Sequence, residues 1–345
     1  MKTLLSLLFL LLLLGMCQAE PRLIPAGPET ETKDWMLGPW EKYEQPVMEP
    51  GAERDAVDSR NIYNMATIFE EGLVKMIFRA ESLSEPAKSM TGRLCLAESS
   101  DGRSFQKLPE GSMPKPVLVP TEPYEKMGVE DPRLVKIDGT YYLTYSAWDG
   151  EKARLCLATS KDLKSWEKHG PLFPNYAPTR GWTKSGAILP EKLKTGPYKD
   201  KYIMYFGDTH IWMAVSEDLI KWEPIEEPVF SPREGHFDNV LVEPGPPAMR
   251  TEDGIILIYN GAGRFEESGD KLIYATGQIL LDGNDPTQVL DRSEQPFLAV
   301  TQSWEKEGYV DNVVFAEGLV KLKDQWLLYY GGGDRVIGLA VAPAR

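Results

Sequence analysis

One short segment places two carboxylates, a proline and an arginine in direct succession. It reads Gly128-Val129-Glu130-Asp131-Pro132-Arg133-Leu134 and stands just before a run of β-forming residues. Pro132 restricts its own φ and is expected to hold Asp131 extended, so that this carboxylate points in a defined direction. Arg133 is suited to orienting a carboxylate or binding an anion through two parallel hydrogen bonds. Taken alone, this segment is better explained as a salt-bridged turn at the start of a strand than as a catalytic site.

The strands that must position this segment can be recognised because their sequences repeat. Arg93-Leu94-Cys95-Leu96-Ala97 recurs 61 residues later as Arg154-Leu155-Cys156-Leu157-Ala158. A Ser-x-Asp-x-x-x-aromatic pattern follows each copy and appears a third time, beginning at Ser99, Ser160 and Ser216. The Ser and Asp are expected to hydrogen-bond local backbone in a tight turn, while the aromatic ring packs between sheets. We interpret these residues as structural.

Five β-rich runs continue this series without any helical periodicity. They occupy residues 75–80, 141–146, 202–206, 254–260 and 325–330. Their starts are about 50–70 residues apart, enough for a four-stranded sheet with its turns. The pattern predicts an all-β chain folded as a five-bladed β-propeller over residues 61–345, with these runs as the innermost strands. Residues 20–60 are predicted to be an N-terminal extension that packs on the propeller or closes it.

The first nineteen residues have the layout of a secretory signal peptide. Lys2 precedes an eleven-residue apolar run from Leu4 to Leu14, and Cys17-Gln18-Ala19 offers a cleavage site. The apolar run is shorter than the roughly 18 residues that a membrane helix needs. We therefore expect cleavage after Ala19 and a secreted or periplasmic protein with no membrane partner.

Composition excludes several other classes of protein. Residues 1–19 contain one Lys and no acid, so their removal changes the net charge from -14 to -15. So acidic a protein is a poor partner for nucleic acid or anionic lipid. Cys95 and Cys156 take equivalent places in two repeats, which favours two buried apolar side chains over a disulfide. The three His stand apart from any Cys, so we expect no metal site.

Several segments together resemble glycoside hydrolase family 130, the β-mannoside phosphorylases and related inverting β-mannosidases. The resemblance covers residues 60–343 and agrees with a five-bladed propeller. It is carried by Phe78-Arg79-Ala80, Glu130-Asp131-Pro132-Arg133 with Lys136-Ile137-Asp138-Gly139-Thr140, Lys184-Ser185-Gly186-Ala187-Ile188, Glu243-Pro244-Gly245-Pro246-Pro247-Ala248 and Phe315-Ala316-Glu317-Gly318-Leu319.

The resemblance implies an active site that handles an oligosaccharide or mannoside. Asp131 matches the residue regarded as the proton donor of the family, which acts through a sugar hydroxyl. Inorganic phosphate is the implied co-substrate, and no cofactor is expected. The implied substrate-binding or phosphate-binding residues are Asn64, Arg79, Arg133, Arg154, Lys184, His210 and Glu243.

A proton donor must be protonated at working pH, so the pKa of Asp131 should be raised by burial or a neighbouring carboxylate. Glu130 is placed to raise it, and a nearby Arg133 would oppose the rise. Aromatic faces for sugar rings are expected near the funnel. The candidates are Trp148, Tyr205, Trp212 and Tyr259.

Two alternatives stay open beside phosphorolysis to mannose 1-phosphate. An inverting hydrolase would need a carboxylate that activates water, and Glu243 or Glu317 is available for this role. A non-catalytic propeller would bind sugar without turning it over. Other propeller glycosidases should carry an Asp near the first strand run, where this chain has Arg79.

Overall fold

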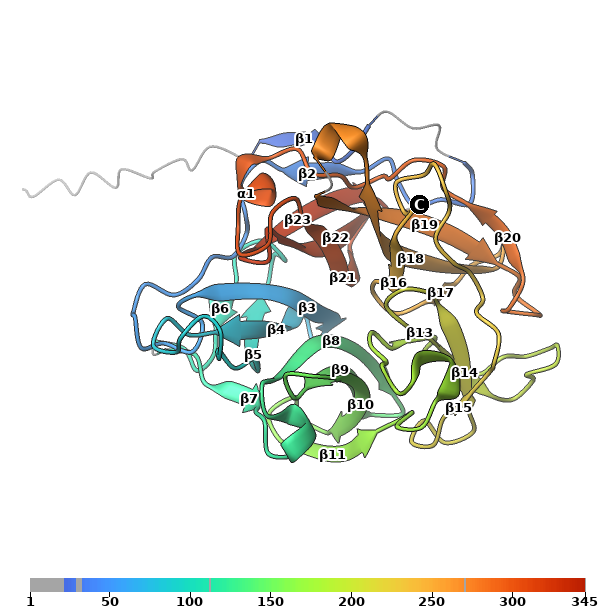
Figure 1. The fold of residues 1–345 in the computed structure, drawn as a ribbon, viewed down its shortest axis with the longest axis horizontal. Helices are drawn as coiled ribbons and strands as arrows, with labels where there is room; N and C mark the ends of the chain where they lie inside the picture. The colour runs from blue at the N-terminus through green and yellow to red at the C-terminus, as the bar shows by residue number, and fades with distance from the viewer. Residues whose placement is uncertain (1–21, 29–32, 112, 270, 345) are drawn as a thin grey trace, which may run out of the picture.

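The computed structural model describes residues 22–344, apart from residues 29–32, 112 and 270. In this part of the chain, five antiparallel sheets surround a common axis as the blades of a β-propeller (Figure 1), which confirms the predicted fold. The expected signal peptide lies outside the described residues. No helix among the described residues is long and apolar enough to cross a membrane.

Each of the first three blades is a sheet of short antiparallel strands. Blade 1 contains β3 (Asn61–Glu70), β4 (Leu73–Glu81), β5 (Arg93–Ser99) and β6 (Gln106–Lys107), with β7 (Pro116–Leu118) also paired to β5. Blade 2 contains β8 (Gly128–Ile137), β9 (Thr140–Trp148), β10 (Ala153–Ser160) and β11 (Trp166–Pro171). Blade 3 contains β12 (Ala187–Ile188), β13 (Tyr202–Phe206), β14 (Trp212–Ser216) and β15 (Glu223–Pro224).

The last two blades follow the same plan. Blade 4 contains β16 (Leu241–Pro244), β18 (Ile255–Arg264), β19 (Leu272–Leu281) and β20 (Val289–Arg292), with β17 (Met249–Arg250) beside β18. Blade 5 contains β21 (Val314–Leu322), β22 (Gln325–Gly332) and β23 (Val336–Pro343), followed by β2 (Glu41–Tyr43) and β1 (Leu23–Pro25). Short helical turns cover connections at η1 (Pro123–Glu125), η2 (Ala177–Thr179), η3 (Glu266–Ser268) and α1 (Ser303–Lys306).

The innermost strand of each blade is one strand earlier than the sequence indicated. Strands β3, β8, β16 and β21 lie nearest the axis in Figure 1, and β12 has the same edge position in its sheet. The runs predicted to be innermost are the second strands β4, β9, β13, β18 and β22. A second strand is covered by neighbours on both sides, so its sequence is the more continuously apolar and gives the stronger signal.

The hydrophobic core is divided among the interfaces between neighbouring blades. Leu143 and Tyr145 of blade 2 pack with Ile77 of blade 1, and Met204 and Phe206 of blade 3 pack with residues of blade 2. The other three clusters join blades 3 and 4, blades 4 and 5, and blades 5 and 1. Each blade therefore depends on both neighbours, as expected for a closed repeat.

The ring is closed by strands from opposite ends of the chain. Strand β2 pairs with β23, so blade 5 contains residues from near both ends of the described chain. Lys42 on β2 donates to both carboxylate oxygens of Glu305 in α1, at 2.7 and 2.8 Å, and both side chains are fully buried. This ion pair holds the N-terminal segment against blade 5.

The repeated Ser-x-Asp turns have the predicted local role. Ser160 Oγ accepts the amide hydrogen bond of Leu163 at 2.9 Å, and Asp162 Oδ1 accepts two further amides of the same turn. Ser99 and Ser216 accept the corresponding amide bonds in the other two copies. The cysteines of the repeat, Cys95 and Cys156, are buried and free, which confirms that they form no disulfide.

Candidate active site

The central polar residues lie where the inner strands are interrupted. The register of β8 against β9 shifts between Glu130 and Arg133, and that of β3 against β4 shifts between Tyr63 and Met65. Asp131 and Asn64, at these two bulges, have positive φ values of 50° and 44°. Bulges re-aim side chains and are common beside active sites. Asp131 is thus presented by a bulge inside β8.

This geometry corrects the expectation that Pro132 holds Asp131 extended. A φ of 50° is outside the extended region that a residue before proline usually adopts. The bulge sets two residues of β8 against one of its partner strand, and this constraint overrides the local preference. Positive φ values at non-glycine residues are uncommon and concentrate at functional sites.

Asp131 is 4% exposed and is surrounded by three polar side chains. Asn64 Nδ2 donates to Asp131 Oδ1 at 2.6 Å, and Arg79 Nη1 donates to the same oxygen at 3.2 Å. Lys184 Nζ lies 3.5 Å from the other oxygen, Oδ2. Four predicted site residues from three blades therefore meet at one carboxylate.

The charges around Asp131 reverse the predicted shift of its pKa. Burial by itself would raise the pKa of Asp131, but the positive charges of Lys184, Arg79 and Arg133 hold it well below its usual range. The prediction of a raised pKa is therefore wrong for the ligand-free protein. Charge that offsets these cations would favour the protonated form of Asp131.

Arg79 is engaged by carboxylates on several sides. Its Nε and Nη2 donate to Glu81 Oε1 at 3.1 and 2.8 Å, and Nη2 lies 3.0 Å from Glu130 Oε1. Its guanidinium also lies over the ring of Tyr63, 4.6 Å from the centroid. These contacts fix the orientation of the Arg79 group that touches Asp131.

Two further carboxyl groups near Arg79 hold their protons unusually tightly. Burial raises the pKa of Glu130 from 4.5 to about 7, and the charge of Asp131 adds to the rise. Burial likewise raises the pKa of Asp334 to about 7. Glu130 and Asp334 therefore change charge near neutral pH, whereas the neighbouring Asp131 stays ionised.

The raised pKa of Glu130 predicts that stability falls as pH rises. Between about pH 5.5 and pH 8 the folded state binds a proton that the unfolded chain releases, so the free energy of unfolding should drop by about 2 kcal/mol for this group. Asp131, whose pKa is lowered, contributes a constant amount in this window. Urea unfolding at the two pH values measures the change, and Glu130→Gln should remove the part due to Glu130. Stability that rises over this range would contradict the prediction.

Arg133 is buried next to Asp131 and reaches from blade 2 to partners on blades 4 and 5. It is 1% exposed and donates to the carbonyl oxygens of Asp131, Pro244 and Gly245 at 2.9, 2.7 and 3.1 Å. Its Nη1 lies 2.7 Å from Glu317 Oε1, and Glu317 is fully buried. The predicted contact of Arg133 with substrate or phosphate does not fit these contacts, because all its donors serve the scaffold. Arg133 positions the bulge that carries Asp131.

Lys184 and Glu243 form the opposite side of the site. Lys184 Nζ lies 3.5 Å from Glu243 Oε1, the same distance as from Asp131, and Ser185 donates a hydrogen bond to Glu243. Burial raises the pKa of Glu243. Among the three cations at the centre, the Lys184 side chain is the most exposed, at 23% against 14% for Arg79 and 1% for Arg133. It is the cation best placed to meet an anionic ligand.

Two predicted residues are tied to other partners. Arg154 Nη1 lies 2.6 Å from Asp149 Oδ2, as its repeat equivalent Arg93 pairs with Glu85, so its contacts are those of a blade-building residue. His210 Nδ1 contacts Ser231 Oγ at 2.8 Å. These contacts give neither residue a link to Asp131.

Three of the four aromatic residues predicted near the funnel belong to the core instead. Tyr205 and Tyr259 are fully buried and Trp212 is 6% exposed, so all three belong to the core. Trp148 lies at the end of β9, where its ring meets that of Trp182 at a centroid distance of 5.8 Å. Trp182 was missed, although it stands only two residues before Lys184 in the sequence.

Tyr274 is a second residue that sequence reasoning missed. It lies in β19, and burial together with the charge of Glu243 raises its pKa to about 12. No local pattern marks it, because its proximity to Glu243 and Lys184 depends on how β19 pairs with β18. It adds a hydroxyl group to the blade 4 side of the site.

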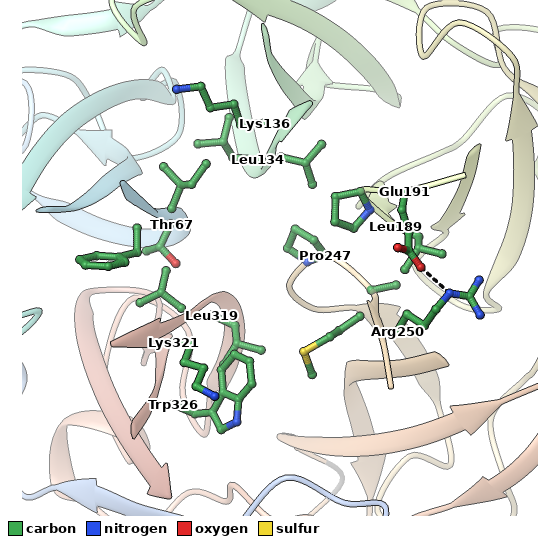
Figure 2. A pocket seen from close by; sticks show the side chains of 17 residues that line it. Thr67, Leu134, Lys136, Leu189, Glu191, Pro247, Arg250, Leu319, Lys321 and Trp326 are labelled. Atoms are coloured by element: carbon green, nitrogen blue, oxygen red, sulfur yellow. Dashed lines mark hydrogen bonds and ion pairs between the residues drawn. The ribbon is translucent and has the colours of Figure 1, made fainter. Parts of the chain in front are cut away.

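The opposite mouth of the channel has a different character. The far ends of the inner strands enclose a cavity of about 540 Å³ (Figure 2). Leu134, Leu189, Pro247 and Leu319 line it, with Trp326 at its edge and the Glu191–Arg250 ion pair to one side (Figure 2). The carboxylates and cations around Asp131 are absent from its lining, so the candidate site lies at the other end of the channel.

Comparison with known proteins shows what the whole chain is similar to. The sequence model of a family described as beta-1,4-mannooligosaccharide phosphorylase matches residues 31–345. A 1,2-beta-oligomannan phosphorylase of Thermoanaerobacter sp. (strain X514) is 37% identical over 306 residues, covering 86% of this chain and 95% of that protein.

Solved structures agree over nearly the whole chain. A glycosyl hydrolase from Bacteroides ovatus is 36% identical with a TM-score of 0.82, covering 92% of this chain and 97% of its own. A second structure, also 36% identical, has a TM-score of 0.81 and covers 90% of this chain and 96% of its own. It is described as part of a family of mannoside phosphorylases that contains glycoside hydrolases targeting beta-1,2 mannosidic linkages in Candida mannan.

Proposed function

The chain belongs to glycoside hydrolase family 130, and from this premise we propose that it cleaves β-1,2-mannosides with inversion by phosphorolysis, with Asp131 as the proton donor. It is a glycoside phosphorylase or glycosidase acting on β-mannosides. The observation that carries the proposal is the meeting of Arg79 and Lys184 at Asp131, at 3.2 and 3.5 Å. One carboxylate and two cations are the groups that proton transfer and phosphate binding require.

The reaction breaks the bond between the anomeric carbon and the glycosidic oxygen. Asp131 supplies the proton that the leaving oxygen takes up, through a sugar hydroxyl as the resemblance implies. A phosphate oxygen attacks the anomeric carbon from the opposite face of the ring, as inversion requires. A β-mannoside therefore yields α-mannose 1-phosphate and a chain shortened by one unit.

Phosphate binding would also prepare Asp131 for its role. The cations that lower the pKa of Asp131 are the ones expected to hold phosphate, Lys184 and Arg79. A bound phosphate dianion offsets their charge, so the pKa of Asp131 rises when the second substrate arrives. The depressed pKa of the ligand-free protein is then compatible with proton donation in the complex.

The relatives favour the β-1,2 linkage. The family description names β-1,4-mannooligosaccharides, whereas the curated relatives are a 1,2-beta-oligomannan phosphorylase and beta-1,2-mannobiose phosphorylases. The individual relatives carry more weight than the family description, because each is similar to this chain over most of its length. We also propose that the protein is exported, with Glu20 as the first mature residue, and that catalysis needs no cofactor, since phosphate is a co-substrate.

Hydrolysis is the second candidate, and one observation favours it. Arg79 and Lys184 already have carboxylate partners, so a phosphate would have to compete with Glu81, Glu130 and Glu243. Glu243 is a buried carboxylate beside the site with a raised pKa, as a general base near neutral pH requires. Glu317 is less suited, because it is enclosed behind Arg133.

Product analysis tests the choice between phosphate and water. With β-1,2-mannobiose and inorganic phosphate, we expect mannose 1-phosphate and mannose in equal amounts, and almost no cleavage when phosphate is omitted. The reaction uses the purified protein, and anion-exchange chromatography separates and quantifies mannose 1-phosphate and mannose. Free mannose alone, formed at the same rate with and without phosphate, would overturn phosphorolysis and support the hydrolase.

A further inference from the structure

Trp182 is a large aromatic side chain that is exposed at the funnel and yet held rigidly. It is 36% exposed. Its indole N–H donates to Asp208 Oδ2 at 2.5 Å, and its ring meets that of Trp148 edge-on at an interplanar angle of 70°. Fixed on two sides, the ring loses little conformational freedom when a ligand covers it.

Trp182 lies between two turns at the active end of the propeller. The backbone N–H of Thr183 donates to the carbonyl of Ala153, next to the turn between β9 and β10 in blade 2. On the other side, the carbonyl of Lys184 accepts the N–H of Gly207, in the turn between β13 and β14 of blade 3. The segment therefore bridges blades 2 and 3 at the rim of the funnel.

The register of β8 against β9 shows how far Trp148 lies from Asp131 along the strand direction. Glu130, next to Asp131, pairs with Ser146, whereas Gly128 pairs with Trp148. Trp148 is thus two residues farther along the strand toward the funnel mouth, about 7 Å at the usual rise of a strand. Asp208, which holds Trp182, contributes negative charge at both Lys184 and Glu243. The exposed ring therefore borders the entrance to the site around Asp131.

We propose that Trp182, supported by Trp148, is the platform for the sugar on the leaving-group side of the bond that is cleaved. This inference rests on the proposed function. A mannosyl unit seated at Asp131 is enclosed below by buried residues such as Arg133 and Glu317, so the rest of the chain must leave past the rim. An apolar ring face at that height suits the C–H face of a pyranose, and the indole of Trp offers the largest such face.

The test compares Trp182→Ala with the matched variant Phe69→Ala. Phe69 is 40% exposed, close to the 36% of Trp182, and it lines the cavity at the opposite mouth of the channel. Its removal therefore deletes an aromatic ring of similar exposure that lies far from the candidate site. We expect Trp182→Ala to raise KM for β-1,2-mannobiose about tenfold with kcat little changed, and to weaken binding by calorimetry equally. Phe69→Ala should leave both unchanged. Trp182→Phe, which keeps a ring but lacks the N–H donor to Asp208, should recover most of the affinity.

The outcomes separate this inference from the proposed function. If Trp182→Ala cleaves and binds β-1,2-mannobiose as the wild type does, the platform is wrong and the function stands. If the wild type binds the sugar without cleaving it and Trp182→Ala binds it more weakly, the stacking of a sugar on Trp182 stands and the proposed function is wrong. Equal losses of sugar affinity in Trp182→Phe and Trp182→Ala would overturn stacking. The loss of affinity would then come from the missing hydrogen bond to Asp208, which both variants remove.

Discussion

Replacing Asp131 with Asn should lower kcat for β-1,2-mannobiose phosphorolysis by about a thousandfold, within the range of 10²–10⁴ typical of a lost general acid. The amide keeps the size of the side chain and still accepts a hydrogen bond from Arg79, but it has no acidic proton to give. Binding of the sugar should be largely preserved. Initial rates of mannose 1-phosphate release measure the loss, and calorimetry measures binding.

Two further variants make this result specific. Asp291→Asn changes a carboxylate of β20 that is partnered by Lys33 and Trp35, and should leave the rate unchanged. Glu130→Gln tests the neighbouring carboxyl, whose pKa of about 7 makes it the alternative acid. If Glu130→Gln loses the activity and Asp131→Asn retains more than about a tenth of it, Glu130 is the donor and the assignment of Asp131 is wrong.

Replacing Lys42 with Met should cause the largest loss of stability among the single substitutions considered. Glu305 would remain fully buried with its charge uncompensated, and loss of one partner of a buried pair costs about 3–5 kcal/mol. The midpoint of thermal unfolding should fall by about 10 °C, since 1 kcal/mol corresponds to roughly 2–4 °C for chains somewhat shorter than this one. Circular dichroism followed through heating measures it.

The control uses an ion pair that is partly exposed. Lys33→Met removes a partner of Asp291 whose side chain is 33% exposed, and should cost less than about 1 kcal/mol. The double variant Lys42→Met, Glu305→Gln leaves no buried charge at this pair. Its amide oxygen can still accept the backbone N–H groups of Thr301 and Gln302, while its NH2 donates to the Tyr330 hydroxyl. It should recover more than half of the stability lost. A Lys42→Met protein as stable as the wild type would show that β2 contributes little to closing the ring.

The repeat could be read from the sequence because its causes are local. Ser160 and Asp162 bind amides within four residues of themselves, and each copy of the turn repeats these bonds. Cys95 and Cys156 stand at the same place in two blades, which separates them by a blade spacing and leaves both free. A closed ring of five such units follows from the number of runs.

Identifying the innermost strands required contacts between blades. Strand β12 has only two residues and β16 four, too short to give a strand pattern of their own. The apolar second strands gave the clear signal and were taken for the innermost ones. This error did not displace the site, because Asp131 and Lys184 are marked by their own motifs.

The sequence by itself determined the propeller, the enzyme family and the carboxylate at the centre of the candidate site, because turn chemistry, strand periodicity and the Glu130-Asp131-Pro132-Arg133 stretch are all local patterns. Only the tertiary structure decided what surrounds Asp131. It brought Asn64 and Arg79 from blade 1 and Lys184 from blade 3 to the carboxylate on blade 2, enclosed Arg133 behind it and gave Arg154 a partner elsewhere. It also reversed the expected pKa, since the field at a buried carboxylate is the sum of charges that are distant in sequence.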